Sequence, residues 1–209
     1  LLEGEELQMP DIDHWKGMSK ELVDYRNKTG EEAIWTNNMF SGMPGYMISV
    51  RYPGNLASFF TDNLRKIFSI ASFIILYLIG FYILLSSLKI KRWLSVAGAI
   101  AFAFSSYLLI ILVAGHMSKA NAIAYLAPLI AGVLLAFRGK YLAGTILFSL
   151  SFSLELLSGH LQITYYGFLL LALLGLTQLI YAIREKTLPS FFKAFFFLLA
   201  GAIVAVGMN

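Results

Sequence analysis

Long apolar stretches, separated by short polar connections, make up the chain from residue 67 onward. About 20 apolar residues in a helix cross a hydrocarbon core ~30 Å thick, and a backbone in lipid must satisfy its own hydrogen bonds. Runs of this length without alternation therefore indicate helices. Six such runs occur, at residues 67–88, 93–114, 122–137, 141–158, 164–183 and 190–208. The pattern predicts an all-α, polytopic integral membrane protein with about six transmembrane helices, of which 122–137 and 141–158 are short for a span.

The first 65 residues are polar and carry a different periodicity. Pro10 and Asp11 are typical of a helix start, and Gly30 is typical of a helix end. Apolar side chains recur between them at helical spacing, at Trp15, Met18, Leu22 and Tyr25. This pattern predicts an amphipathic helix that lies at the membrane surface. The stretch at 35–49, rich in glycine and methionine, predicts a loop packed on the bilayer surface.

Composition supports this division into two parts. Hydrophobic residues make up 58% of the chain and charged residues 13%, whereas soluble domains carry roughly 25% charge. All acidic residues except Glu155 and Glu185 precede residue 66. We therefore predict a polar segment over 1–65 and a membrane domain over 66–209, and we expect the chain to be a fragment truncated at both ends.

The basic residues predict the orientation. They cluster in three connections, with Lys89, Lys91 and Arg92 after the first run, Arg138 and Lys140 after the third, and Arg184, Lys186 and Lys193 around the fifth connection. If every run spans, these connections share one side, which the positive-inside rule makes cytoplasmic. The extracytoplasmic side of a bacterial inner membrane then receives residues 1–65 and the connections 115–121 and 159–163. This explanation of the net charge of +4 argues against nucleic acid as a partner.

Asp11 is the candidate catalytic residue of the polar segment. On a helix it lies about 40° from Trp15 and about 20° from Met18, whereas Asp13 lies about 160° from Asp11. Asp11 is thus the carboxylate expected to point toward the membrane domain. There it would act as a general base for an acceptor hydroxyl or bind a divalent metal. The alternative is a capping role at the start of its helix, where aspartate is strongly preferred.

His116 and Lys119 interrupt the apolar sequence and are three residues apart, so they share a face on any helical turn. One interpretation is an anion site for a phosphate carried by a lipid, to which Arg65 and Lys66 would also contribute. The alternatives are that His116 and Lys119 extend to the headgroups, and that Arg65 and Lys66 are attracted to anionic lipid.

Glu155 lies among apolar residues near the end of its run, where a carboxylate is costly in lipid and usually faces a polar interior. Lys119 is its expected partner. His160 and Gln162 follow in the next connection, either as further substrate-binding residues or as ordinary loop residues.

Several classes of chemistry have no support in the sequence. Cysteine is absent, which excludes a disulfide framework and a thiolate metal site. No Walker loop, dinucleotide-binding glycine motif, HExxH motif or nucleophile elbow is present, so ATP-driven and soluble-cofactor enzymes are unsupported.

Four motifs, "DIDHWKGMSKE", "YRNKTGEEAIWTNNMFSGMPGYMIS", "AGHMSKANAIAYLAP" and "GHLQITYY", resemble the YfhO-like bacterial membrane proteins of the Bacteroidetes type. That family is grouped with the GT-C glycosyltransferases. The resemblance implies a GT-C-like helical bundle, with residues 1–65 as the first outer loop. It also implies a polyprenyl-phosphate sugar donor and catalysis by an acidic residue of this loop, which here is Asp11. Glutamine is commoner in the family at the position of His14, so no role is assigned to His14.

The leading hypothesis is an inverting membrane glycosyltransferase of the cell envelope that transfers a sugar to an extracytoplasmic acceptor. Asp11 would orient or deprotonate the acceptor, while Lys119 and His116, with Arg65 or Lys66, hold the lipid phosphate. Two alternatives remain open. One is a transporter or flippase for a lipid-linked or anionic substrate, with Glu155 and Lys119 as a charge pair. The other is a non-catalytic assembly protein whose outer loop binds a partner.

Overall fold

The computed structural model describes residues 9–49 and 54–209. The chain divides into two compact units. One comprises Leu1–Gly54 with Ile110–Met117, and the other comprises Asn55–Leu109 with Ser118–Asn209. Helices dominate both units, in agreement with the predicted all-α membrane protein.

The first unit begins with the helix α1 (Pro10–Thr29). Pro10 occupies its first turn, where a missing backbone N–H costs nothing. Gly30 ends it with φ of 77°, and its N–H donates to the carbonyl of Arg26 at 2.9 Å. Glycine adopts this left-handed conformation without a steric penalty. Both predicted ends of the helix are confirmed.

The 35–49 segment is more regular than the predicted loop. The strands β1 (Trp35–Thr36) and β2 (Met43–Pro44) pair antiparallel, and a 3₁₀ turn, η1 (Gly45–Met47), follows. The N–H of Gly45 donates to the carbonyl of Ile34 at 2.7 Å. A Cβ at position 45 would lie 2.5 Å from the carbonyl oxygen of Ala33, so this crossing requires glycine. A loop was therefore the wrong prediction for the residues in these elements.

The apolar stripe of α1 packs on this segment. Leu22, only 1% exposed, lies against Gly45. The indole N–H of Trp15 donates to the carbonyl of Ile48 at 2.9 Å. Arg26 donates to the carbonyl of Ser49 at 2.8 Å and forms an ion pair with Glu32. Part of the stripe thus stabilises its own unit, while the predicted membrane-surface position of α1 stays a prediction.

A polar contact joins α1 to β1. The hydroxyl of Thr36, which is fully buried, donates to a carboxylate oxygen of Glu21, and the N–H of Asn37 donates to the same oxygen at 3.1 Å. The hydrogen bond from Thr36 is the largest cause that lowers the pKa of Glu21, because it stabilises the ionised carboxylate. The contact of Glu21 with the hairpin is therefore stronger when the carboxylate is ionised.

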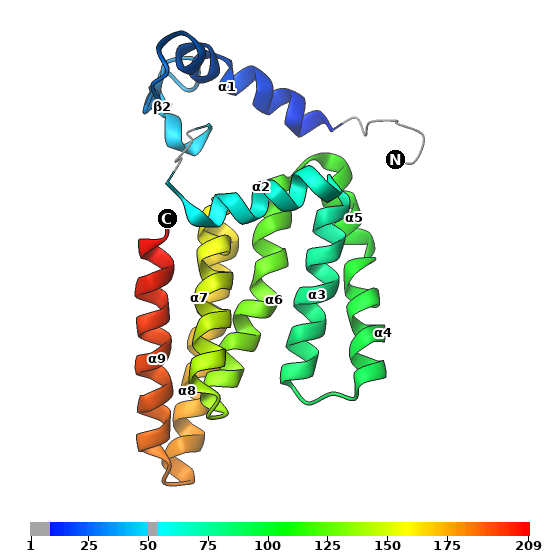
Figure 1. The fold of residues 1–209 in the computed structure, drawn as a ribbon, viewed down its shortest axis with the longest axis vertical. Coiled ribbons are helices and arrows are strands. Elements are labelled where there is room, and N and C mark those ends of the chain that lie inside the picture. Colours follow the sequence, from blue (N-terminus) through cyan, green and yellow to red (C-terminus); the bar gives the residue numbers. More distant parts are fainter. Residues whose placement is uncertain (1–8, 50–53) are drawn as a thin grey trace. The chain divides into compact units, whose positions relative to one another are not determined.

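Helices make up the described part of the second unit, apart from their connections (Figure 1). They are α2 (Leu56–Phe68), α3 (Ala71–Ser87), α4 (Arg92–Ala103), most of α6 (Met117–Phe137), α7 (Tyr141–Leu157), α8 (Leu161–Arg184) and α9 (Leu188–Gly207), while α5 (Ser106–Ala114) is divided between the units. Among the described residues, length and composition qualify four stretches as spans: Arg92–Ala114, α6, α8 and α9. The bent pair α2 and α3 provides a fifth if it counts as one span, and α7 is a shorter apolar helix.

Two of the predicted runs differ from the helices that contain them. The run at 67–88 is helical in α3 only from Ala71, because Ser69, with φ of 49°, ends α2 and the axes of α2 and α3 differ by 119°. The predicted boundary after residue 65 falls inside α2. The run at 93–114 is interrupted after Ala103, where α4 gives way to α5.

The helix α6 contacts α3 through small residues. The hydroxyl of Tyr77, fully buried on α3, donates to the carbonyl of Ala120 at 3.1 Å. One turn further along each helix, a Cβ on Gly80 would lie 3.0 Å from the carbonyl oxygen of Ala124. At Gly80 the two backbones therefore approach closely, as is typical of small residues between membrane helices.

The opposite end of α6 contacts α7 in the same way. A Cβ on Gly132 would lie 2.6 Å from the backbone nitrogen of Phe148, and one on Gly144 would lie 2.5 Å from that of Ala136. These distances are shorter than any real Cβ contact, so neither glycine can be replaced without separating the helices. The crossing of α6 and α7 is therefore fixed by two glycines.

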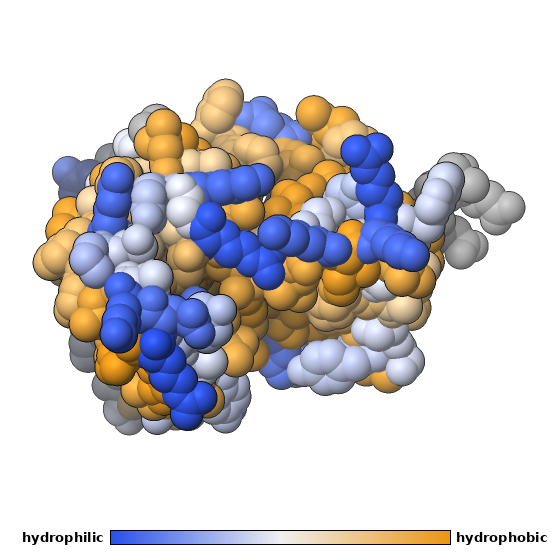
Figure 2. Space-filling model, turned by 90° about the horizontal axis from the view of Figure 1, so that it is seen from below, coloured by the Kyte–Doolittle hydropathy of each residue, from blue (hydrophilic) through white to orange (hydrophobic). Residues whose placement is uncertain are grey.

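The three basic connections lie at one end of the helices of the second unit, between α3 and α4, α6 and α7, and α8 and α9 (Figure 1). Figure 2 looks onto this end and shows hydrophilic side chains gathered over it, beside apolar helix surfaces. The sequence predicted that these three basic connections would share one side if successive spans run in opposite directions, and they do share one end.

Gly132→Ala is expected to lower the free energy of unfolding by about 1–3 kcal/mol, because the added methyl overpacks the α6–α7 crossing. Gly175→Ala on α8 is the matched control, since a Cβ there meets nothing within 4 Å. Reversible unfolding in detergent micelles or bicelles measures both variants. Equal stability of the two would show that the crossing tolerates the methyl group.

The hairpin is expected to lose protection from amide exchange at acidic pH. Glu21 has a lowered pKa, so its stabilisation is complete above the pKa of the unfolded chain and is lost as the pH falls through the folded pKa. Protection factors for residues 35–44, corrected for intrinsic exchange, measure the effect. Glu21→Gln should flatten this acid dependence, whereas Glu31→Gln, on an exposed residue, should preserve it.

Candidate functional site

Asp11 and His116 form an ion-pair contact within the first unit. A carboxylate oxygen of Asp11 meets Nδ1 of His116, which lies 105 residues further along the chain. Both side chains remain accessible, with exposed fractions of 45% and 43%. Histidine and aspartate are residue types that transfer protons in enzymes, and a carboxylate in contact with an imidazole orients the ring. The structure thus joins two of the residues singled out in the sequence.

Gly115 makes this contact possible. Its φ is 89°, and a Cβ at this position would lie 3.3 Å from Cβ of Asp11 and 3.2 Å from Cβ of Met9. A larger residue would therefore be strained in its backbone and crowded by α1. The signal for this role in the sequence is the glycine immediately before the histidine.

Asp11 is not the N-cap of α1, so the capping hypothesis is wrong. The N-cap is Met9, whose side chain makes no capping hydrogen bond, and Asp11 lies one residue inside the helix after Pro10. A carboxylate in the first turn interacts favourably with the helix dipole. Its oxygens are free for His116, because no capping role engages them.

The predicted connection at 115–121 is shorter than expected. Because α5 ends at Ala114 and α6 begins at Met117, only Gly115 and His116 lie between them. Lys119 therefore sits in the first turn of α6, where the helix dipole disfavours a cation. Helix stability gives no reason for a lysine there, which leaves anion binding or extension toward the headgroups as its role.

Glu155 has a different partner from the one expected. Its Oε1 accepts a hydrogen bond from the hydroxyl of Thr164 at 2.8 Å, and no ion pair joins it to Lys119 in the described part of the chain. The prediction of a Glu155–Lys119 pair is wrong. Glu155 is 2% exposed, and its Oε2 has no hydrogen-bond partner among the described residues.

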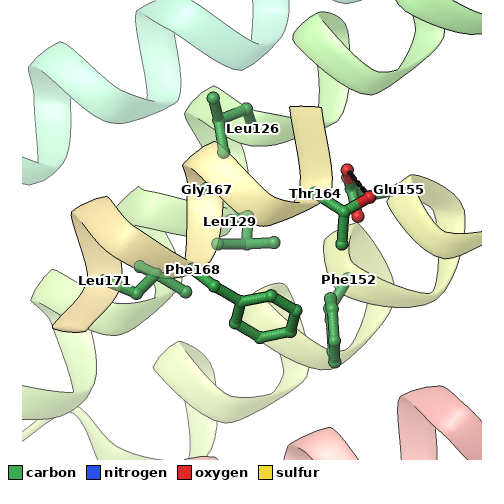
Figure 3. A pocket seen from close by; sticks show the side chains of 8 residues that line it. All are labelled: Leu126, Leu129, Phe152, Glu155, Thr164, Gly167, Phe168 and Leu171. Atoms are coloured by element: carbon green, nitrogen blue, oxygen red, sulfur yellow. Dashed lines mark hydrogen bonds between the residues drawn. The ribbon is translucent and has the colours of Figure 1, made fainter. Parts of the chain in front are cut away.

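A small void of about 10 Å³ adjoins this carboxylate (Figure 3). Its lining is apolar except for Glu155 and Thr164, and the other residues are Leu126, Leu129, Phe152, Gly167, Phe168 and Leu171. A void of this size is at the lower limit for one water molecule. The unpartnered oxygen is thus a buried acceptor, a costly feature that membrane proteins usually retain for function.

His160 and Gln162 take part in local structure. His160 is the N-cap of α8, where its Nδ1 accepts from the N–H of Ile163 at 3.4 Å. The amide of Gln162 donates to the hydroxyl of Tyr166 one turn later, at 3.0 Å. Of the two interpretations open for this connection, these contacts support the ordinary structural one.

Arg65 and Lys66 lie in the last turn of α2 rather than on the first long apolar helix. The guanidinium of Arg65 lies 5.6 Å from the centre of the Phe73 ring, in range for a cation–π interaction. Arg65 also lines a cavity of about 190 Å³ between α2, α6 and α7, whereas Lys66 is not among its lining residues. The two neighbouring cations thus have different surroundings.

Several polar residues of this cavity were missed in the sequence. They are Ser58, Thr61, Asp62, Asn121, Tyr125 and Ser158. The signal was present, because Ser58, Thr61, Asp62 and Arg65 are spaced by three and four residues and share one face of α2. A search for helical periodicity of polar residues over 56–68 would have found this face.

A divalent metal, considered above for Asp11, has no cluster of ligands to hold it in the part of the chain that the structure describes. No group of three or more histidine and acidic side chains with metal-binding geometry occurs among these residues.

Thr164→Val is expected to lower the free energy of unfolding by about 1–3 kcal/mol, because it leaves both oxygens of a buried carboxyl group without a donor. Thr177→Val is the matched control on the same helix, since its exposed hydroxyl donates only to the carbonyl of Leu173 within α8. Thermal unfolding in detergent compares the two. A larger loss in Thr177→Val would contradict the importance of the Thr164–Glu155 hydrogen bond.

Comparisons with protein-family models, with curated proteins and with solved structures found no match for this chain.

Proposed function

We propose that the chain is part of a membrane glycosyltransferase of GT-C-like fold, related to the YfhO-like family, that transfers a sugar from a polyprenyl-phosphate donor to an extracytoplasmic acceptor. The observation that carries the proposal is the contact between Asp11 and His116. Its support from the sequence is the ordered set of four motifs, two of which contain these residues.

The reaction assigns each group one task. The acceptor hydroxyl gives its proton to the Asp11–His116 pair while its oxygen bonds to the anomeric carbon of the sugar. The bond between that carbon and the lipid phosphate breaks, and the phosphate leaves with the electron pair. Attack from the side opposite the leaving group inverts the anomeric configuration. The negative charge on the leaving phosphate requires stabilisation by a cation.

The proposed setting is a bacterial inner membrane, with residues 1–65 on the extracytoplasmic side. The basic connections at one end of the second unit support this orientation, because cytoplasmic connections are enriched in lysine and arginine. A lipid-linked donor requires such a setting, since its isoprenoid chain stays in the bilayer.

Asp11→Asn is expected to reduce transfer about 10²- to 10⁴-fold, the contribution typical of a general base. Transfer of a radiolabelled sugar from polyprenyl phosphate to envelope acceptors, in membranes that contain the protein, measures this loss. Asp13→Asn is the control, because Asp13 pairs only with Lys16 on an exposed part of α1. Full activity in Asp11→Asn would remove Asp11 from the mechanism.

A transporter or flippase is the second candidate, favoured by the buried Glu155 oxygen without a partner. Glu155→Gln would then abolish proton-coupled transport, whereas Asp11→Asn would leave it unchanged. The same membranes, assayed for uptake or lipid flipping, discriminate the candidates, because each predicts that only one of the two substitutions abolishes the measured activity.

A further inference from the structure

The cavity of about 190 Å³ lies within the second unit, where α2 meets the N-terminal part of α6 and the C-terminal end of α7. Figure 1 shows α2 running across the ends of these helices, at a large angle to them. The ends of membrane helices are at the depth of the lipid headgroups. The cavity is therefore placed where a headgroup is available as a ligand.

The helix α2 turns its polar face toward this cavity. Its opposite face is apolar and exposed, with Phe59 and Ile67 each 72% exposed. In a soluble protein an amphipathic helix buries its apolar face. Here the apolar face is available to lipid, and the polar face encloses a protein cavity. In a membrane, the polar residues of a helix are expected to face a protein cavity, because lipid offers them no polar partners.

Two opposite charges line the cavity and do not neutralise each other. Asp62 and Arg65 are three residues apart on α2. In the described ranges, neither forms an ion pair with any residue. Both side chains are exposed, so each charge is accessible to a ligand beside the apolar residues Leu154 and Leu157 of the lining. A ligand that compensates both must carry an anion and a cation.

The hydroxyl groups of the lining favour a cation near Asp62. Ser58 donates its proton to the carbonyl of Asn55 at 2.7 Å, Thr61 to that of Ser58 at 2.9 Å, and Ser158 to that of Glu155 at 2.5 Å. Since these protons are engaged by backbone carbonyls, only the oxygen lone pairs remain for a ligand. Acceptors of this kind match the three N–H donors of a primary ammonium group.

The remaining polar groups favour an anion near Arg65. Asn121 is 7% exposed and Tyr125 is 3% exposed. Neither side chain makes a hydrogen bond with another described residue, so the amide and the phenol both have a proton to donate. Together with the guanidinium of Arg65 they form a donor set suited to a phosphate, which arginine recognises with two parallel hydrogen bonds.

We propose that this cavity binds phosphoethanolamine, the headgroup of a zwitterionic aminophospholipid. The phosphate accepts hydrogen bonds from Arg65, Asn121 and Tyr125. The ammonium group pairs with Asp62 and donates to the hydroxyl oxygens. The volume suits a headgroup, since pockets for larger ligands of about drug size start near 300 Å³. Neutral sugars would leave both charges unpaired, and an anionic headgroup such as phosphatidylglycerol would leave Asp62 unpaired. The inference does not depend on sugar transfer.

The test measures lipid preference on the purified full chain. Binding of phosphatidylethanolamine, phosphatidylglycerol and phosphatidylcholine is followed by native mass spectrometry, and soluble glycerophosphoethanolamine is titrated in parallel. We expect phosphatidylethanolamine to bind about tenfold more tightly than the other two, because the choline headgroup cannot donate hydrogen bonds and the glycerol headgroup has no cation. If glycerophosphoethanolamine also binds, the acyl chains are dispensable. If only phosphatidylethanolamine binds, the acyl chains contribute to the affinity.

Two variants separate the roles of the charges. Asp62→Asn should reduce the preference for phosphatidylethanolamine over phosphatidylglycerol to within about twofold, and Arg65→Gln should weaken both about tenfold. Glu185→Gln and Arg138→Gln are the matched controls, on exposed residues outside the cavity. Thermal unfolding of each variant confirms that it folds, and Arg65→Lys should restore part of the phosphate affinity. Equal binding of the three lipids, or equal effects of Asp62→Asn and Glu185→Gln, would overturn the proposal.

Discussion

The close contact of α6 with α3 and α7 is the constraint on which the second unit depends. Lipid tails are as apolar as leucine, so helices in a bilayer gain little by burying large apolar side chains against each other. Close backbone approach and hydrogen bonds hold them together instead. Gly80, Gly132 and Gly144 permit the approach, and Tyr77 supplies a hydrogen bond to the backbone of α6. Because α6 is fixed from both sides, Asn121 and Tyr125 are held in the wall of the cavity.

Different contacts stabilise the first unit. Besides the buried Leu22, its contacts are polar: Arg26 pairs with Glu32, Glu21 with Thr36, and Trp15 with a backbone carbonyl. One glycine, with a left-handed backbone, brings the connection before α6 against α1. The contact between Asp11 and His116 is therefore a product of backbone geometry rather than of side-chain packing.

Much of the fold was predictable because periodicity and apolar length are local properties. Pro10 and Gly30 bounded α1 correctly, and each apolar run overlaps at least one helix. The breaks after Phe68 and Ala103 were not predictable, since neither proline nor glycine marks them. The partner of Glu155 was also missed, because a sequence suggests opposite charges and gives no weight to a threonine at the start of the next helix.

The two polar groupings differ in a way that bears on their chemistry. Asp11 and His116 contact each other, so each side chain orients the other without a bound ligand. Asp62 and Arg65 lie on one helix face without pairing in the described structure. A proton-transfer unit needs an internal partner that orients it, whereas a recognition site needs charges that are left for the ligand. The first grouping therefore has the geometry required of the proton-transfer unit that we propose, and the second has that required of the proposed headgroup site.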